Sequence, residues 1–239
     1  MHRHAEKEPS PAEIGIAYPE YRPTHRFKGT SIDRFHRYLG KVPTIGEGLV
    51  QLRNYEPTGE IIEGWMTRPE VLKLYEMAYF ANGDLLEIGC YQGLSTFVSA
   101  KAIRHSRRPR IIYSLDLFEG AMRLALWNLY VGKSLKHARF VVGDAYSITH
   151  SYAHTGKRFA FAFVDFSHAY QQVYEVCTLL DQVMQPGGFV LFHDYNDPRN
   201  VDPNEPDYGV YQGVVDGLKP HHFEFYGMYG SAGLYRVKE

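Results

Sequence analysis

The sequence predicts a doubly wound α/β protein with a mostly parallel, seven-stranded sheet that ends in an antiparallel hairpin. Short apolar runs alternate with helical patterns from residue 67 onward, which is typical of βαβ units. The run Phe159–Val164 is continuously apolar, as expected of a strand buried on both faces. The last two apolar runs are separated by only a few residues. Because a parallel crossover needs a dozen residues or more, these two strands must be antiparallel.

The ordered part of the chain is predicted to begin with a capping box, in which Thr67 is followed three residues later by Glu70. Apolar residues then recur at helical spacing as far as Asn82-Gly83. The predicted parallel strands cover residues 84–88, 110–115, 139–142, 159–164 and 189–192, and the hairpin covers 223–228 and 233–237. Further helices are predicted from about residue 95, over residues 121–130, and along residues 173–184, where Pro186-Gly187-Gly188 ends the last one.

Residues 1–62 are predicted to form an irregular N-terminal arm ahead of a domain at residues 63–239. The arm contains six prolines and one predicted helix over residues 31–39, with Ser31 as its N-cap. Several roles fit it equally: it wraps the body, covers a site, is partly disordered, or joins two copies in a homo-oligomer.

Composition and charge restrict the class of partner. The 26 basic and 27 acidic residues give a net charge of -1, which argues against a nucleic-acid footprint. No apolar stretch approaches the roughly 20 residues of a membrane span, and the first residues lack the apolar run of a signal peptide. Two cysteines in apolar surroundings indicate core thiols and suit a cytoplasmic protein.

Every predicted parallel strand delivers an acidic residue to its carboxyl end, the edge where open α/β sheets bind ligands. These residues are Glu87, Asp116, Asp144, Asp165 and Asp194. Asp116 is placed to accept hydrogen bonds from ribose hydroxyls, and Asp144 to accept one from an adenine amino group. The glycines after the first strand permit close approach of a ligand, but their spacing departs from the dinucleotide fingerprint. Together they indicate a nucleoside pocket without a pyrophosphate clamp.

These motifs resemble the class I S-adenosylmethionine-dependent methyltransferases, which have a Rossmann-like fold. The resemblance covers residues 63–239 and is carried by the runs Glu63-Gly64-Trp65-Met66-Thr67, Glu87-Ile88-Gly89-Cys90-Tyr91-Gln92-Gly93-Leu94-Ser95-Thr96, Asp165-x-x-His168-x-Tyr170 and His193-Asp194-Tyr195. Tyr91 stands where the usual family loop has its middle glycine. This variation is similar to the macrocin O-methyltransferase and cephalosporin-hydroxylase-like branch (methyltransferase family 24).

The resemblance implies an O-methyltransferase that acts on a small-molecule hydroxyl. It favours a sugar or a glycosylated natural product as the acceptor. It implies S-adenosylmethionine as cofactor, bound by Glu87, Gly89, Tyr91, Gly93, Ser95, Asp116, Asp144, Ala145 and Asp165.

Members of this group often hold a divalent cation, and the resemblance places it on Asp165, His193 and Asp194. His193 replaces the usual acid or amide, whereas Mg²⁺ prefers oxygen ligands, so Mg²⁺, another divalent cation and no metal all stay open. The candidate catalytic residues are His168, His193 and Asp165. Either histidine could remove the proton, because imidazole titrates near neutral pH, and a cation on Asp165 and Asp194 could instead acidify and orient the hydroxyl.

Three competing interpretations are a nicotinamide dehydrogenase, a non-catalytic nucleoside-binding protein, and a methyltransferase that acts on a peptide. The glycine spacing argues against the first, and the acids at the sheet edge together with His168 argue against the second.

Overall fold

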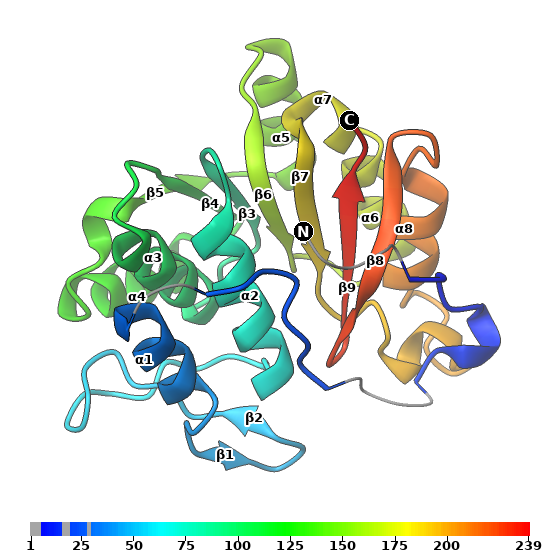
Figure 1. The fold of residues 1–239 in the computed structure, drawn as a ribbon. Helices are drawn as coiled ribbons and strands as arrows, with labels where there is room; N and C mark the ends of the chain where they lie inside the picture. Colours follow the sequence, from blue (N-terminus) through cyan, green and yellow to red (C-terminus); the bar gives the residue numbers. More distant parts are fainter. Residues whose placement is uncertain (1–5, 16–19, 28–29) are drawn as a thin grey trace.

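A seven-stranded sheet forms the centre of the computed structural model, which describes residues 6–15, 20–27 and 30–239 (Figure 1). The strand order is β5-β4-β3-β6-β7-β9-β8; β3 to β7 are parallel, and β9 runs antiparallel to both β7 and β8. This confirms the predicted doubly wound, Rossmann-like sheet with its C-terminal hairpin. The strands are β3 (Leu85–Ile88), β4 (Ile112–Asp116), β5 (Ala138–Val142), β6 (Phe159–Val164), β7 (Met184–Phe192), β8 (Phe223–Tyr229) and β9 (Ala232–Val237).

Helices cover both faces of this sheet, as Figure 1 shows. One face carries α1 (Thr30–Leu39), α2 (Arg68–Phe80), α3 (Leu94–Ser106) and α4 (Glu119–Val131). The other carries α5 (Ala145–His154), α6 (Tyr170–Cys177), α7 (Leu180–Val183) and α8 (Val210–Gly217). Short 3₁₀ helices at Pro11–Glu13, Leu135–His137 and Pro198–Val201 and a small hairpin of β1 (Thr44–Ile45) and β2 (Leu49–Val50) complete the elements. No helix in the described ranges has the length and apolar character that crossing a bilayer requires.

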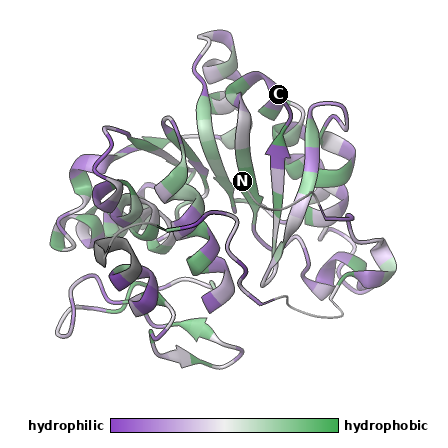
Figure 2. Cartoon of the chain, in the orientation of Figure 1, coloured by the Kyte–Doolittle hydropathy of each residue, from purple (hydrophilic) through white to green (hydrophobic). Residues whose placement is uncertain are grey.

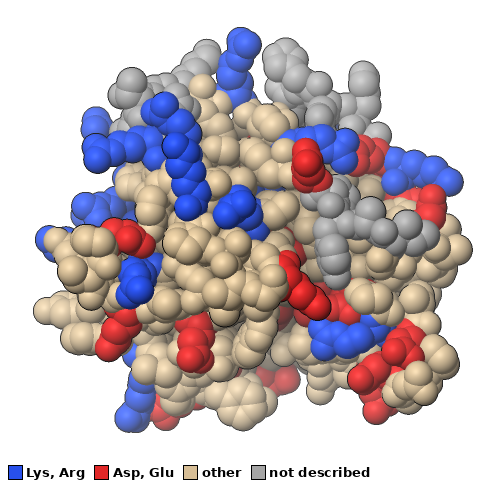
Figure 3. Space-filling view, turned by 90° about the horizontal axis from the view of Figure 1, so that it is seen from below, with Lys and Arg blue, Asp and Glu red and all other residues tan. Residues whose placement is uncertain are grey.

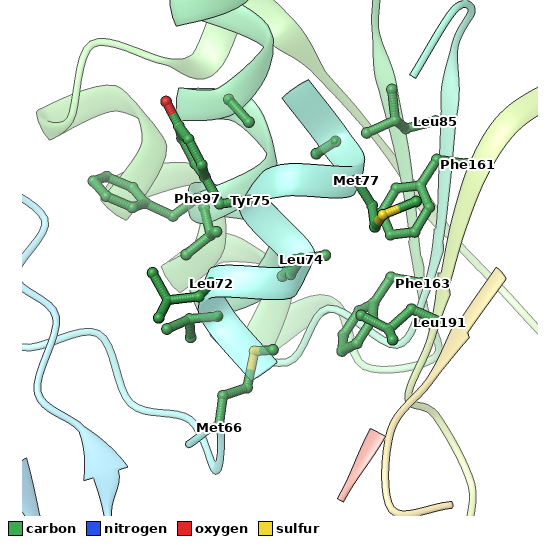
Figure 4. Close-up of a cluster of buried hydrophobic side chains, with 14 of the residues drawn as sticks. Met66, Leu72, Leu74, Tyr75, Met77, Leu85, Phe97, Phe161, Phe163 and Leu191 are labelled. Atoms are coloured by element: carbon green, nitrogen blue, oxygen red, sulfur yellow. The ribbon is translucent and has the colours of Figure 1, made fainter. Parts of the chain in front are cut away.

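The period of two along each strand divides the core into two layers. Phe161 and Phe163 of β6 pack with the α2 and α3 side, whereas Ala162 and Val164 pack with the α6 and α8 side. Figure 4 shows Met77 of α2 beside Phe161 in the first layer. The strands are correspondingly hydrophobic and the outer helix surfaces more hydrophilic (Figure 2).

The described parts of the N-terminal arm are anchored to the body at two places. Near its start, the hydroxyl of Tyr195 donates to Glu8 Oε1 at 2.8 Å, and Gly15 N–H donates to Asn196 Oδ1 at 2.9 Å. Further along, Glu76 of α2 is fully buried and accepts from the backbone N–H groups of Thr24 and His25 at 2.7 and 2.6 Å. The described parts of the arm therefore contact both the segment after β7 and helix α2, and the boundary at residues 62 and 63 stays a prediction.

Four details differ from the sequence prediction. The helix over residues 31–39 begins at Thr30, so it includes Ser31, which is not its N-cap. The stripe over residues 173–184 divides into α6 and α7, and Pro186-Gly187-Gly188 lies inside β7 instead of ending a helix. Helices α5 and α8 were not predicted. Two glycines in α8 interrupt the apolar pattern that would predict a helix. They are needed for packing, because a Cβ at Gly213 would lie 2.9 Å from Val173 Cβ.

Candidate active site

A cavity of about 1040 Å³ opens at the carboxyl ends of the parallel strands, on the lower side of the molecule in Figure 1. Its wall includes strand ends and the turns after them, the N-terminus of α2, and the β1–β2 hairpin of the arm. Figure 3 views the molecule from this side and shows basic and acidic side chains interspersed among uncharged ones. The volume is at the upper end of the range for small-molecule sites, so it can hold a cofactor together with an acceptor.

The turn after β3 forms one part of the cavity wall. Gly89 has φ of +88°, and a Cβ there would lie 1.8 Å from the carbonyl oxygen of Asp165, so only glycine fits. Asp116 at the end of β4 accepts from the backbone N–H groups of Cys90 and Tyr91 at 3.0 and 2.8 Å. These contacts bring three predicted cofactor residues, Gly89, Tyr91 and Asp116, to one wall.

Three other predicted cofactor residues lie behind this wall instead of lining the cavity: Glu87, Gly93 and Ser95. Glu87 is fully buried, and its Oε2 accepts from the hydroxyls of Thr96 and Ser114, both at 2.5 Å. Gly93 is the N-cap of α3, where a Cβ would lie 2.6 Å from Ala125 Cβ. These residues therefore support the turn after β3 from the side away from the cavity.

The remaining predicted cofactor residues line the cavity at the ends of β5 and β6. Asp144 is the N-cap of α5 and accepts from Ser147 N–H at 2.8 Å, which lowers its pKa, and Ala145 follows it. Asp165 lies at the end of β6, next to Phe166.

His193, at the end of β7, is almost fully buried between three carboxylates. Its Nδ1 lies 3.4 Å from Asp165 Oδ1 and 3.2 Å from Asp194 Oδ1, and its Nε2 lies 3.5 Å from Glu70 Oε2. These are ion-pair contacts without hydrogen-bond alignment. Burial would lower the pKa of His193, but the surrounding negative charges outweigh that cost and raise it well above the ordinary value.

Glu70 is a member of this cluster that the sequence indicated only as a helix cap. Its Oε2 does accept from Thr67 N–H, at 2.5 Å, as a capping box requires. Its Oε1 accepts from the N–H and hydroxyl of Ser231 at 2.6 and 2.8 Å. Because Glu70 is also the counter-charge of His193, it joins α2 and the β8–β9 turn to the end of β7.

His168 is the one predicted catalytic histidine with an open approach to the cavity. Its side chain is 48% exposed, and its Nε2 lies 3.0 Å from Asp194 Oδ2. The ring stacks on Tyr208 at 4.9 Å, and the backbone oxygen of His168 accepts from Gly209 N–H at 2.7 Å. Nδ1 of His168 has no hydrogen-bond partner in the described part of the chain.

Asp194 connects the two histidines. It has φ of +54°, an uncommon conformation for a non-glycine residue. Burial would raise the pKa of Asp194, but the charge of His193 and the hydrogen bond from His168 hold it far below the ordinary value. Asp194 is therefore a carboxylate that can orient the His168 ring.

The three residues expected to hold a metal, Asp165, His193 and Asp194, come together at the ends of β6 and β7. Both nitrogens of His193 face carboxylates and are buried. The group with ligand atoms within 4.8 Å of one another is instead Asp165, His168 and Asp194.

Residues 86–195 match the family model described as a methyltransferase domain (methyltransferase family 24). This range includes the turn after β3, Asp116, Asp144, Asp165 and the two histidines. No curated protein matches the chain.

Solved structures share the fold. The O-methyltransferase TomG from Streptomyces achromogenes, in complex with SAM, superposes with a TM-score of 0.60 at 21% identity, over 73% of this chain and 82% of TomG. An O-methyltransferase from Bacillus cereus, in complex with SAH, has a TM-score of 0.59 at 15% identity, over 87% of this chain and 89% of that one.

Proposed function

We propose that this chain is a class I S-adenosylmethionine-dependent methyltransferase, which its match to a methyltransferase domain and its fold support, and that it transfers the methyl group to a hydroxyl of a small molecule. The observation that carries the proposal is the His168–Asp194 pair at the edge of a cavity whose other wall is the turn after β3.

The cavity residues fit the cofactor. S-adenosylmethionine supplies a methyl group that is already activated by its sulfonium. Gly89 and Tyr91 present backbone close to the cavity. Asp116 and Asp144 also line it, and we assign their carboxylates to the ribose hydroxyls and the adenine amino group. Glu87, Gly93 and Ser95 support the turn from beneath.

For proton removal we assign His168 as the general base. A hydroxyl that attacks the methyl carbon forms the new C–O bond as the S–C bond breaks, and its proton must leave. If Nε2–H of His168 donates to Asp194, the unpartnered Nδ1 can take that proton, in the usual manner of an oriented imidazole. His193 is too buried to reach an acceptor, so we assign it and Asp165 to holding Asp194 in place.

The residues do not fit a magnesium ion. His193 lies between three carboxylates whose charges favour its protonated form, and a protonated imidazole has no lone pair for a metal. The other grouping, Asp165, His168 and Asp194, includes an imidazole nitrogen where Mg²⁺ prefers oxygen. We therefore derive no step through a metal. Turnover should be unchanged within twofold when Mg²⁺ is left out of the assay, and an absolute requirement for Mg²⁺ would contradict this assignment.

We further propose that the acceptor is a sugar or a glycosylated natural product. The sequence resemblance to the macrocin O-methyltransferase branch supports this choice, and the structural neighbour TomG is described as involved in tomaymycin synthesis. The cavity volume leaves room for an acceptor beside the cofactor.

The test is an acceptor screen with methyl-labelled S-adenosylmethionine, using glycosides, phenols and short peptides as separate panels. Label transfer to a glycoside hydroxyl is the expected result. Transfer to phenols alone or to peptides alone would overturn the acceptor class, and the position of the label, oxygen or nitrogen, tests the O-methyltransferase assignment.

A further inference from the structure

Two aromatic side chains stand open in the cavity wall. Trp65, just ahead of α2, is 65% exposed, and Tyr91, in the turn after β3, is 40% exposed. Their ring centroids lie 5.1 Å apart, with the planes tilted by 37°. No step of the methyl transfer described above uses either ring. Open aromatic faces inside a cavity are typical surfaces for a ligand to cover.

The Trp65–Tyr91 pair is held from several sides. The backbone of Tyr91 has φ of +42° and its N–H donates to Asp116. The side chain of Gln92 donates to the Tyr91 hydroxyl at 3.0 Å and to Glu63 Oε2 at 2.9 Å, which joins the turn to the segment that carries Trp65.

The arm hairpin closes the same wall. Val50 N–H of β2 donates to the carbonyl of Met66 at 2.9 Å, so the hairpin is hydrogen-bonded to the residue next to Trp65. Thr44, Glu47 and Leu49 of the hairpin line the cavity, and Glu47 is exposed. Two aromatic rings and an exposed carboxylate therefore line the same cavity.

Such a combination matches a saccharide ring. One face of a sugar ring is apolar C–H surface that packs on an aromatic ring, whereas its edge carries hydroxyl donors that need acceptors. A phenol would place fewer donors against this wall.

Resting on the proposed function, we propose that Trp65, seated on Tyr91, is the platform for a saccharide ring of the acceptor, and that Glu47 accepts hydrogen bonds from its hydroxyls. Trp65 and Glu47 then determine specificity, and Tyr91 is a positioning residue. The hairpin thereby gives the N-terminal arm a role in acceptor choice.

The chain offers a direct readout, because it contains only two tryptophans. Trp127 lies on α4 outside the cavity, stacked on Tyr130. In a Trp127→Phe variant, Trp65 is the single tryptophan, and excitation at the red edge of the absorption band selects it over the 19 tyrosines. With the protein saturated by S-adenosylhomocysteine, we expect a saturable change in Trp65 emission on titration with methyl glycosides of the gluco, galacto, rhamno and xylo series, and no such change with catechol.

Variants then separate the roles, with calorimetry on the S-adenosylhomocysteine-loaded protein as the readout. Trp65→Ala should weaken glycoside binding by about tenfold, the upper range for one ring contact. Glu47→Gln should also weaken it, whereas Tyr91→Phe should preserve it, since the ring is retained. Binding of S-adenosylhomocysteine should stay within twofold in Trp65→Ala and Glu47→Gln.

Three results would overturn the platform: no emission change with any glycoside while S-adenosylhomocysteine binds normally, a response to catechol alone, or an equal loss of S-adenosylhomocysteine and glycoside binding in Trp65→Ala. If the Trp127→Phe parent failed to bind S-adenosylhomocysteine at all, the proposed function itself would be wrong.

Discussion

Asp116 Oδ2 lies 2.8 Å from the backbone nitrogen of Tyr91, so the end of β4 fixes the turn after β3. The same carboxylate accepts from Cys90 N–H at 3.0 Å and, through Oδ1, from Phe118 N–H at 2.9 Å. The side chain of Asp116 therefore fixes the shape of this part of the cavity wall through hydrogen bonds within the protein.

Asp116→Ala should weaken the binding of S-adenosylhomocysteine by roughly 100-fold, because each hydrogen bond to a charged acceptor contributes about 1.5–3 kcal/mol. Asp116→Asn keeps one acceptor oxygen and should lose less. Calorimetric titration of both variants measures this, with the melting temperature as a control for folding. Equal affinity in the alanine variant and the parent would remove Asp116 from the cofactor site.

Glu87 gives a pH dependence of stability. Burial raises its pKa to about 7, although hydrogen bonds from Ser114 and Thr96 lower it. The folded state holds the proton of Glu87 more tightly than the unfolded state does. The protonated Glu87 therefore contributes to the free energy of unfolding. This contribution is fully present below pH 4.5 and is lost as the pH rises through about 7. The full effect is about 3 kcal/mol.

Glu87→Gln carries no charge, so it should gain stability relative to the parent between pH 5 and pH 8. Urea denaturation of the unliganded proteins across this range is the measurement. A constant difference between the two proteins at every pH would show that Glu87 does not titrate there.

Glu76 anchors the arm by accepting from the Thr24 and His25 N–H groups, and it also forms a buried ion pair within α2. Lys73 Nζ lies 2.7 Å from Glu76 Oε2, and both side chains are fully buried. Glu76→Gln removes the carboxylate charge from this buried pair, so the free energy of unfolding should fall by about 3–5 kcal/mol. The matched control is Glu119→Gln, which breaks the exposed pair with Arg123 and should leave the free energy of unfolding nearly unchanged. Similar losses in the two variants, read from urea midpoints, would contradict the anchoring role.

The sheet could be predicted from sequence because burial on both faces leaves continuous apolar runs such as Phe159–Val164. Helix α8 could not, since Gly213 and Gly217 look like turn residues until α6 is seen packed against them. The small β1–β2 hairpin was missed because two-residue strands leave no periodic pattern.

The site could be predicted only as far as the strand ends. Residues such as Asp116 and Asp165 lie at those ends, so a parallel sheet brings them to one edge. Glu70 comes from a helix N-terminus and reaches His193 only through tertiary packing. Which histidine is buried and which is open also depends on that packing, and no local pattern distinguishes His193 from His168.

The central claim is that His168 removes the acceptor proton while other groups hold the cofactor. The most direct test compares His168→Ala with the parent in label transfer to the best glycoside of the screen and in calorimetric binding of S-adenosylhomocysteine. A positioned base contributes about 10²–10⁴-fold, so kcat should fall by at least about 100-fold while the Kd of S-adenosylhomocysteine stays within twofold. An unchanged kcat, or a parallel loss of cofactor affinity, would contradict the account.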